Sequence, residues 1–364
     1  MPVLLAIAVL ELLIVVHELG HFLAARAQGI TVTRFSIGFG PVLWKHQGAV
    51  TEYALRAIPL GGYVAFPDDE LDEEIESDDP GLLKNRPILD RAIVISAGVI
   101  ANLIFAYFLM VTQIGWVGLP ELQPQPGVLV PQIAADVSSA AAQAGLQSGD
   151  VVIGVNGETL ATGDVAIQSL MSAIKNSPNQ PIRLEVLRES QTLSLSVTPQ
   201  VEADQVPRIG VRLAPNGTVV RKKATSISNL FGAAATEFQR VVLLTVQGFG
   251  QLISNFQETA NQVSGPVAIV AIGADIARSD LSRLLQFGAL ISINLAVINI
   301  LPLPALDGGQ LAFLLVEAFR GKPLPNEVQQ GVMQTGLFLL LGLGMFLIVR
   351  DTTNLPWVQN LLSQ

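Results

Sequence analysis

Residues 2–25 read PVLLAIAVLELLIVVHELGHFLAA, and this stretch decides the class of the protein. About 20 mainly apolar residues allow a helix to cross the hydrocarbon core of a bilayer. Four ionisable side chains lie within the stretch: Glu11, His17, Glu18 and His21. A signal peptide has a basic start and an uncharged apolar core, so the stretch does not match one. Because ionisable groups at membrane depth are costly, these four side chains are candidates for function.

The composition of the whole chain also indicates a membrane protein. Of its 364 residues, 50% are hydrophobic and only 14% are charged, whereas soluble domains carry about 25% charged residues. The absence of cysteine excludes disulfides, a thiol nucleophile and cysteine-ligated metals. The formal net charge of −9 argues against a nucleic-acid partner, which would require a basic surface.

The negative charge is concentrated in one segment, residues 68–81. Its nine acids are Asp68, Asp69, Glu70, Asp72, Glu73, Glu74, Glu76, Asp78 and Asp79. The other 21 acids match the 21 Lys and Arg residues in number. We expect this segment to be a solvated loop.

Four stretches are expected to form transmembrane helices. They are residues 2–25, 92–119, 284–306 and 331–349. Residues 1–119 and 281–364 would then form the two halves of a membrane core. Basic residues flank the first and last connecting loops, which places both loops in the cytoplasm and leaves the termini and residues 120–280 outside.

Three further regions lie between the expected spans. Residues 30–66 have strand-like alternation and glycine turns, which predict a β-hairpin region at the membrane surface. Residues 124–200 have the composition of an inserted soluble α+β domain. Residues 201–280 are expected to be a linker, with an amphipathic helix or helix pair over 226–262 and a re-entrant or interfacial piece over 266–276.

The strongest chemical signal is His17-Glu18-Leu-Gly-His21, an H-E-x-x-H motif in a helical stretch. Two His residues four positions apart share one helix face and can hold one zinc ion, while Glu18 can act as general base. The alternative is a pair of packing histidines with a paired Glu. Metzincins carry Gly and His where this chain has Ala24 and Ala27, which excludes that class.

Catalytic zinc usually has three protein ligands, so a third is expected elsewhere. Asp307 is the candidate, in the segment 299–309 that reads NILPLPALDGG. Pro302 and Pro304 interrupt a regular helix there, and a carboxylate at a broken membrane helix needs a cationic partner. The alternative is that Asp307 caps the following helix. The third histidine, His46, is expected to face solvent.

Together these features resemble the site-two family of intramembrane zinc metalloproteases, in particular the bacterial regulator-of-sigma-E protease branch. Further segments that resemble it are RFSIGFGP (34–41), PLGGYV (59–64), Ala97-Gly98 with Asn102, and Ser-Gly-Pro (264–266). AGLQSGD (144–150) and VNG (155–157) resemble a PDZ domain. The best-known enterobacterial member has two tandem PDZ domains, whereas this chain has room for one.

The resemblance implies cleavage of single-pass membrane substrates, such as anti-sigma factors and remnant signal peptides, in the bacterial inner membrane. One zinc ion per chain would be held by His17, His21 and Asp307. An extended substrate would add to a strand edge within residues 33–66, which makes Gly61 and Gly62 candidate contacts. Asn299 and Asn102 are candidates for binding the substrate backbone. The alternative role of Asn299 is an interhelical hydrogen bond, and that of Asn102 is helix packing. The PDZ-like domain would filter substrates by size or bind peptide C-termini, unless it is a spacer.

Two other functions remain possible at this point. A catalytically silent scaffold would bind partners through the PDZ-like domain, but a structural zinc site needs a fourth protein ligand and no adjacent base. A membrane-anchored protease for soluble peptides would need its metal helix outside the bilayer, which the apolar flanks of the motif oppose. Glu11 lies on the same helix face as Glu18 and either lines a water path, contacts substrate or sits near the outer interface.

Overall fold

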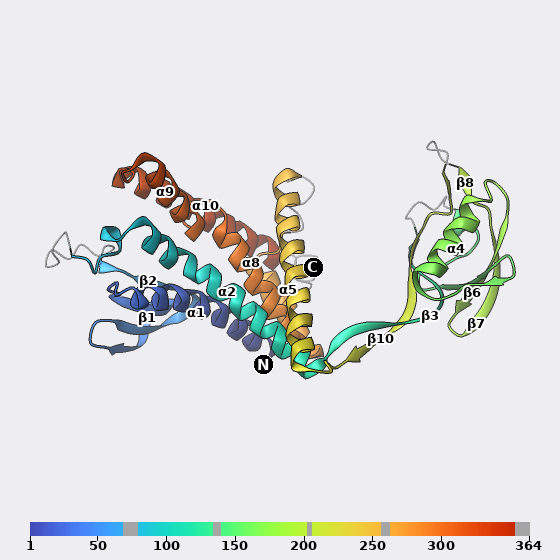
Figure 1. The fold of residues 1–364 in the computed structure, drawn as a ribbon, viewed down its shortest axis with the longest axis horizontal. Helices are drawn as coiled ribbons and strands as arrows, with labels where there is room; N and C mark the ends of the chain where they lie inside the picture. The colour runs from blue at the N-terminus through green and yellow to red at the C-terminus, as the bar shows by residue number, and fades with distance from the viewer. Residues whose placement is uncertain (68–78, 134–139, 202–205, 256–262, 354–364) are drawn as a thin grey trace, which may run out of the picture. The chain divides into compact units, whose positions relative to one another are not determined.

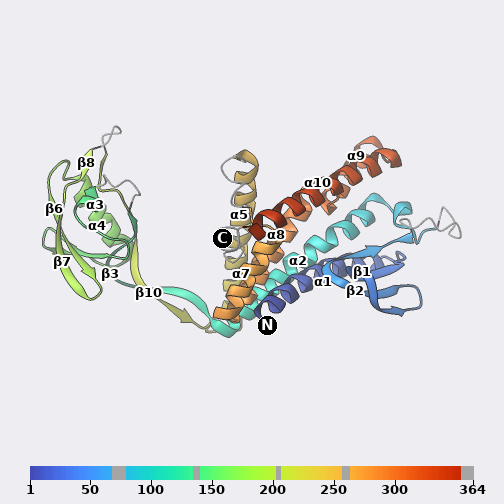
Figure 2. The ribbon, with the colours of Figure 1, turned by 180° about the vertical axis from the view of Figure 1, so that it is seen from behind.

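The computed structural model describes residues 1–67, 79–133, 140–201, 206–255 and 263–353. The expected acidic loop therefore lies outside the described residues except for its last three positions. The chain forms two compact units (Figures 1 and 2). Met1–Gly118 and Lys223–Gln364 make the first, here called the membrane unit, and Leu119–Lys222 makes the second, here called the PDZ-like unit.

Among the described residues of the membrane unit, four helices are long and apolar enough to cross a bilayer, which confirms the expected number. They are α1 (Pro2–Ala27), α2 (Ile88–Val117), α8 (Ser282–Ile300) and α10 (Asn326–Thr353). The third was expected to reach residue 306, but α8 ends at Ile300 because Pro302 and Pro304 cannot continue it.

Small residues allow α1 and α2 to pack closely. A Cβ placed on Gly20 of α1 would lie 2.8 Å from the Cβ of Ala101 in α2. Helix α2 also packs on α8, where Ser292 Oγ donates to the Asn102 carbonyl at 2.8 Å. Close backbone approach between small residues is typical of membrane helix interfaces. The three helices therefore form a tight group around His17.

The expected β-region consists of two long bent strands, β1 (Arg34–Gln47) and β2 (Glu52–Ala65). The first half of each strand pairs with both halves of the other strand. Residues 34–37 pair in parallel with 52–55 and antiparallel with 62–65, while 44–47 pair antiparallel with 52–55. The segment 62–65 thus lies at one edge of the sheet and has no second partner strand among the described residues.

The described part of the membrane unit also contains four shorter or amphipathic helical elements. They are η2 (Leu83–Asn85), α5 (Ile227–Ser254), α7 (Pro266–Ser279) and α9 (Asp307–Arg320). Helix α5 lies within residues 226–262, where an amphipathic helix or helix pair was expected, and α7 has 14 residues, too few to span a bilayer. Helix α9 was not among the expected spans; it ends at Arg320, and Gly321 follows it in a left-handed conformation.

The PDZ-like unit is an α+β domain with five strands in the sheet order β10-β3-β4-β6-β7, and β5 pairs with β4. Its strands are β3 (Leu119–Ile133), β4 (Val151–Val155), β5 (Glu158–Thr159), β6 (Ile182–Arg188), β7 (Gln191–Val197), β8 (Gln200–Val201), β9 (Pro207–Arg208) and β10 (Val211–Lys222). Its helices are α3 (Ala140–Gln143) and α4 (Gly163–Lys175).

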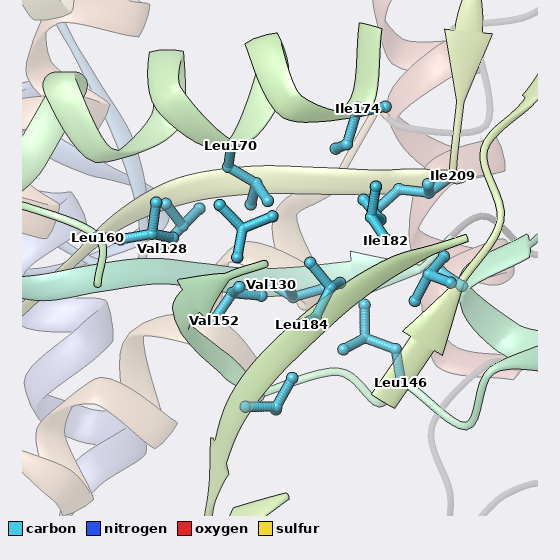
Figure 3. Close-up of a cluster of buried hydrophobic side chains, with 14 of the residues drawn as sticks. Val128, Val130, Leu146, Val152, Leu160, Leu170, Ile174, Ile182, Leu184 and Ile209 are labelled. Carbon is cyan, nitrogen blue, oxygen red and sulfur yellow. The ribbon is translucent and has the colours of Figure 1, made fainter. Parts of the chain in front are cut away.

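The core of this unit lies between α4 and the sheet (Figure 3). Leu170 and Ile174 of α4 point toward strand residues such as Val130 and Leu184, all buried. The unit extends beyond the expected 124–200, because β10 pairs with β3 as far as Lys222 opposite Leu119. Part of the expected linker, 201–280, is therefore a strand of this domain.

Candidate metal centre and active site

Two turns of α1 present the H-E-x-x-H residues to the interior of the membrane unit. The Nε2 atoms of His17 and His21 lie 3.2 Å apart. Asp307 Oδ2, at the start of α9, lies 3.2 Å from the first and 3.4 Å from the second. Within the described part of the chain, these residues are the one group of three or more such side chains close enough to share a metal ion.

This triangle of atoms fits a zinc ion. Zinc binds His and carboxylate ligands at about 2.0–2.1 Å in tetrahedral geometry, which separates the ligand atoms by about 3.3 Å. The three measured separations lie within 0.2 Å of that figure. Asp307 Oδ2 is buried and accepts no hydrogen bond, and such an orphaned oxygen is costly unless a cation binds it. The donor set is therefore that of a three-ligand site with a free fourth position.

The break between α8 and α9 brings Asp307 to the two histidines. Ala305 has a φ of +69°, which turns the chain sharply before α9 begins. Side chains at the two following glycines would collide with the turn: a Cβ on Gly308 would overlap the Ile300 carbonyl, and one on Gly309 would lie 3.1 Å from the Leu303 carbonyl carbon. The proline and glycine signals in the sequence therefore act together to fold the chain back.

Backbone and amide groups of α2 set the orientation of both imidazoles. His21 Nδ1 lies 2.8 Å from the Val94 carbonyl, and since a carbonyl only accepts, Nδ1 carries the proton and Nε2 is free for a metal. The Asn102 amide lies 3.3 Å from His17 Nδ1 and is fully buried. With metal on His17 Nε2, the Asn102 amide oxygen, which otherwise has no hydrogen bond, can accept the Nδ1 proton after an amide flip.

A cavity of about 260 Å³ opens onto the candidate metal ligands. Its lining is Ile14, His17, Glu18, Gly61, Gly62, Asn102, Leu295, Asn299, Ala305, Leu306 and Asp307. The structure thus gathers every site residue expected from the sequence at this cavity except His21, which lies beside it through the metal triangle. His46 is elsewhere: it is exposed on β1 and its ring stacks on Trp44.

The edge strand segment of β2 forms one wall of this cavity. A Cβ on Gly62 would lie 3.2 Å from Glu18 Cγ and 3.8 Å from Ile14 Cγ2, so glycine permits close approach to α1. The backbone of Val64 lies beside the Glu18 carboxylate. Asn299 Nδ2 is 3.3 Å from His17 Nε2. An extended peptide in the cavity would therefore meet a strand edge, a carboxylate and an amide.

Comparison with known proteins identifies the family. Residues 5–343 match the sequence profile of peptidase family M50. The chain belongs to this family. A Nostoc sp. protein that is named a zinc metalloprotease is 61% identical over 367 residues, covering 100% of both chains. The membrane metalloprotease ARASP of Arabidopsis thaliana, a chloroplastic protein, is 49% identical over 99% of this chain and 80% of its own length.

Protease RseP of Yersinia pestis is 31% identical, with 93% of this chain and 96% of that protein covered. Among solved structures, the PDZ domain of the SdrC-like protein from Listeria innocua covers 24% of this chain and 92% of its own, at 17% identity and a TM-score of 0.21. As a member of family M50 with four membrane-length helices, the chain is a zinc metalloprotease and an integral membrane protein.

Two groups near the M50 metal triangle were missed as site components by sequence reasoning. The Val94 carbonyl leaves no sequence signal, because any residue supplies one. Gly98 was noticed only as part of a resemblance, yet a Cβ there would lie 2.7 Å from His17 Cε1 and 2.8 Å from His21 Cε1. The missing side chain of Gly98 therefore makes room for both imidazoles.

Proposed function

We propose that this M50 protease is an intramembrane endopeptidase that cleaves single-pass membrane proteins. The observation that carries the proposal is the position of the metal triangle and Glu18. His17, Glu18 and His21 lie within α1, and Asp307 lies at the start of α9, just beyond the end of α8 at Ile300. Both α1 and α8 are long and apolar enough to span a bilayer. A substrate must therefore reach the site from within or beside the membrane.

His17, His21 and Asp307 would hold one zinc ion per chain, and Glu18 would move the protons. A zinc ion there supplies Lewis-acid chemistry that makes water nucleophilic near neutral pH and polarises the scissile carbonyl. Glu18 follows His17 in α1 and lines the cavity, so its carboxylate can take the proton of the attacking water. The same carboxyl group then gives that proton to the leaving amine. Burial of Asn102 against His17 favours a role in orienting the imidazole over direct substrate contact.

Helical substrates must unwind before cleavage, because their carbonyls are already hydrogen-bonded. The free edge of the 62–65 segment offers main-chain groups that can replace those bonds by strand addition. Gly61 and Gly62 keep this wall close to Glu18. We assign Asn299 to hydrogen bonding with the substrate backbone, because its amide lines the cavity beside His17 Nε2.

The remaining assignments concern location and partners. We propose a bacterial inner-membrane protein with residues 120–280 outside the cytoplasm, acting on anti-sigma-factor-like proteins and remnant signal peptides. In the PDZ-like unit, β10 is an edge strand and α4 packs near it. A peptide C-terminus would add to β10 as a further strand, which would dock trimmed substrates.

The test is co-expression of the protein with a library of tagged single-pass substrates, compared with Glu18→Gln. We expect loss of cleavage by the variant with zinc content and folding retained, since Gln preserves the shape and removes the base. Cleavage that persists in Glu18→Gln would refute the mechanism. Asp307→Ala is expected to lower the zinc content of purified protein, and an unchanged content would remove Asp307 from the site.

A further inference from the structure

Glu11 is an intramembrane carboxylate that the mechanism above does not use. Outside the first and last four residues of the four membrane-length helices, the acidic, basic and imidazole side chains are Glu11, His17, Glu18 and His21. Three of them belong to the candidate active site. Glu11 is the fourth, and a charged group at this depth needs a physical reason to be there.

Among the described residues, Glu11 has no ion-pair or side-chain hydrogen-bond partner. Both carboxylate oxygens are buried and neither accepts a hydrogen bond of normal geometry, although they lie beside the backbone of Gly61. No Lys or Arg among the described residues forms an ion pair with it. An unpartnered buried carboxylate is unfavourable in the isolated protein. A bound cationic or donor group would remove that cost.

The strand that lines the cavity runs along α1 between the two glutamates. Gly61 lies beside Glu11, and Val64 lies beside Glu18. Seven helical residues separate Glu11 from Glu18, about 10.5 Å at 1.5 Å per residue. Three strand residues separate Gly61 from Val64, about 10 Å at 3.3 Å per residue. The two spacings agree, so the β2 segment spans the distance from one carboxylate to the other.

We propose that Glu11 is a specificity-determining residue that binds a Lys or Arg side chain of the substrate about three residues from the scissile bond. This inference rests on the proposed function, in which the substrate adds as a strand to the 62–65 edge. A substrate strand has the same rise per residue as β2. About three substrate residues therefore separate the scissile bond, beside Glu18, from the substrate residue opposite Gly61. The ammonium or guanidinium group would supply the buried carboxylate with its missing partner.

The experiment compares sets of three tagged single-pass substrates, which differ only in whether one position holds Lys, Ala or Glu. A scan places Lys, Ala or Glu at each of the two to four positions on either side of the cleavage site, and the full-length protein in detergent or vesicles cleaves them. For the wild type, we expect kcat/KM to be at least tenfold higher for Lys than for Ala at one position about three residues from the scissile bond. That factor is the size expected of a hydrogen bond to a buried charge.

Two variants of Glu11 and one control decide the matter. Glu11→Gln should reduce the Lys-to-Ala ratio toward one, and Glu11→Lys should reverse the preference in favour of the Glu substrate. Leu12→Gln, at the neighbouring position that is 48% exposed on the outside of the helix, should keep the wild-type ratio. Zinc content measured for all variants checks that the metal site is intact.

Several results would overturn the proposal. One is a wild-type ratio near one at every scanned position. Another is an equal loss of kcat/KM for Lys and Ala substrates in Glu11→Gln, which would show that Glu11 only supports the Gly61 wall. Failure of the proposed function is distinct, because it appears as cleavage that persists in Glu18→Gln or as no cleavage by the wild type.

Discussion

Gly98→Ala is the substitution whose effect the structure defines most sharply. A Cβ at this position would lie 2.7 Å from His17 Cε1 and 2.8 Å from His21 Cε1. Carbon atoms in ordinary contact stay about 3.5 Å apart, so the imidazoles or α2 must move by about 0.8 Å. Metal–ligand distances tolerate only about 0.2 Å. We therefore expect zinc affinity to fall by about 10- to 100-fold.

Activity should fall further, because a misplacement approaching 1 Å at the reacting groups costs about 100-fold in rate. Gly115→Ala is a matched control on the same helix, since its Cβ would meet only the flexible end of Leu230 at 3.5 Å. Both variants gain the same helix propensity, up to about 1 kcal/mol, so their difference isolates the clash. Zinc competition with a chelator measures affinity, and cleavage of a tagged substrate measures rate. Wild-type zinc affinity in Gly98→Ala would refute the reasoning.

Three further predictions concern contacts outside the cavity. Arg91 of α2 and Glu317 of α9 form a largely buried ion pair at 2.5 Å, so Arg91→Ala should destabilise the detergent-solubilised protein by about 3–5 kcal/mol. The double variant Arg91→Glu with Glu317→Arg exchanges the two charges and should restore part of the thermal stability. No restoration would argue against the pair. Asp351 accepts a hydrogen bond from the N-terminus of α7, so Asp351→Ala should cost about 1 kcal/mol, seen as faster hydrogen exchange at the start of α7 but not in α4. Hydrogen bonds from Arg188 hold the pKa of buried Asp150 below its ordinary value of 3.8. The ionised pair therefore stabilises the folded domain fully above about pH 5, and this contribution is lost as pH falls through and below 3.8. Hydrogen exchange of β4 should become faster between pH 6 and 3, and an Asp150→Asn variant with the wild-type pH dependence would contradict this.

The catalytic motif and the membrane class were predictable because both depend on local sequence. The spacing of His17 and His21 places them on one helix face whatever surrounds the helix. Apolar length alone identifies the four membrane helices. The end of the third membrane helix was less predictable. The prolines end α8 at Ile300, and a separate helix, α9, begins at Asp307, but the apolar stretch continues across both.

The PDZ-like unit shows the complementary limit of sequence reasoning. Its local strands, such as β4 and β6, follow from alternation within a few residues. The membership of β10 does not, because pairing with β3 joins residues about 100 positions apart. The expected boundary at residue 200 was therefore too early.

The sequence by itself determined which chemistry this chain carries, because two histidine ligands and the neighbouring base stand within the five consecutive residues His17–His21. Only the tertiary structure decided how that chemistry is assembled. It brings Asp307 within 3.4 Å of both histidines, fixes the proton on His21 Nδ1 through the Val94 carbonyl, and lays Gly61 beside Glu11. These contacts join residues 50 to 290 positions apart, and they form because close packing of the helices and the strand brings those distant segments together.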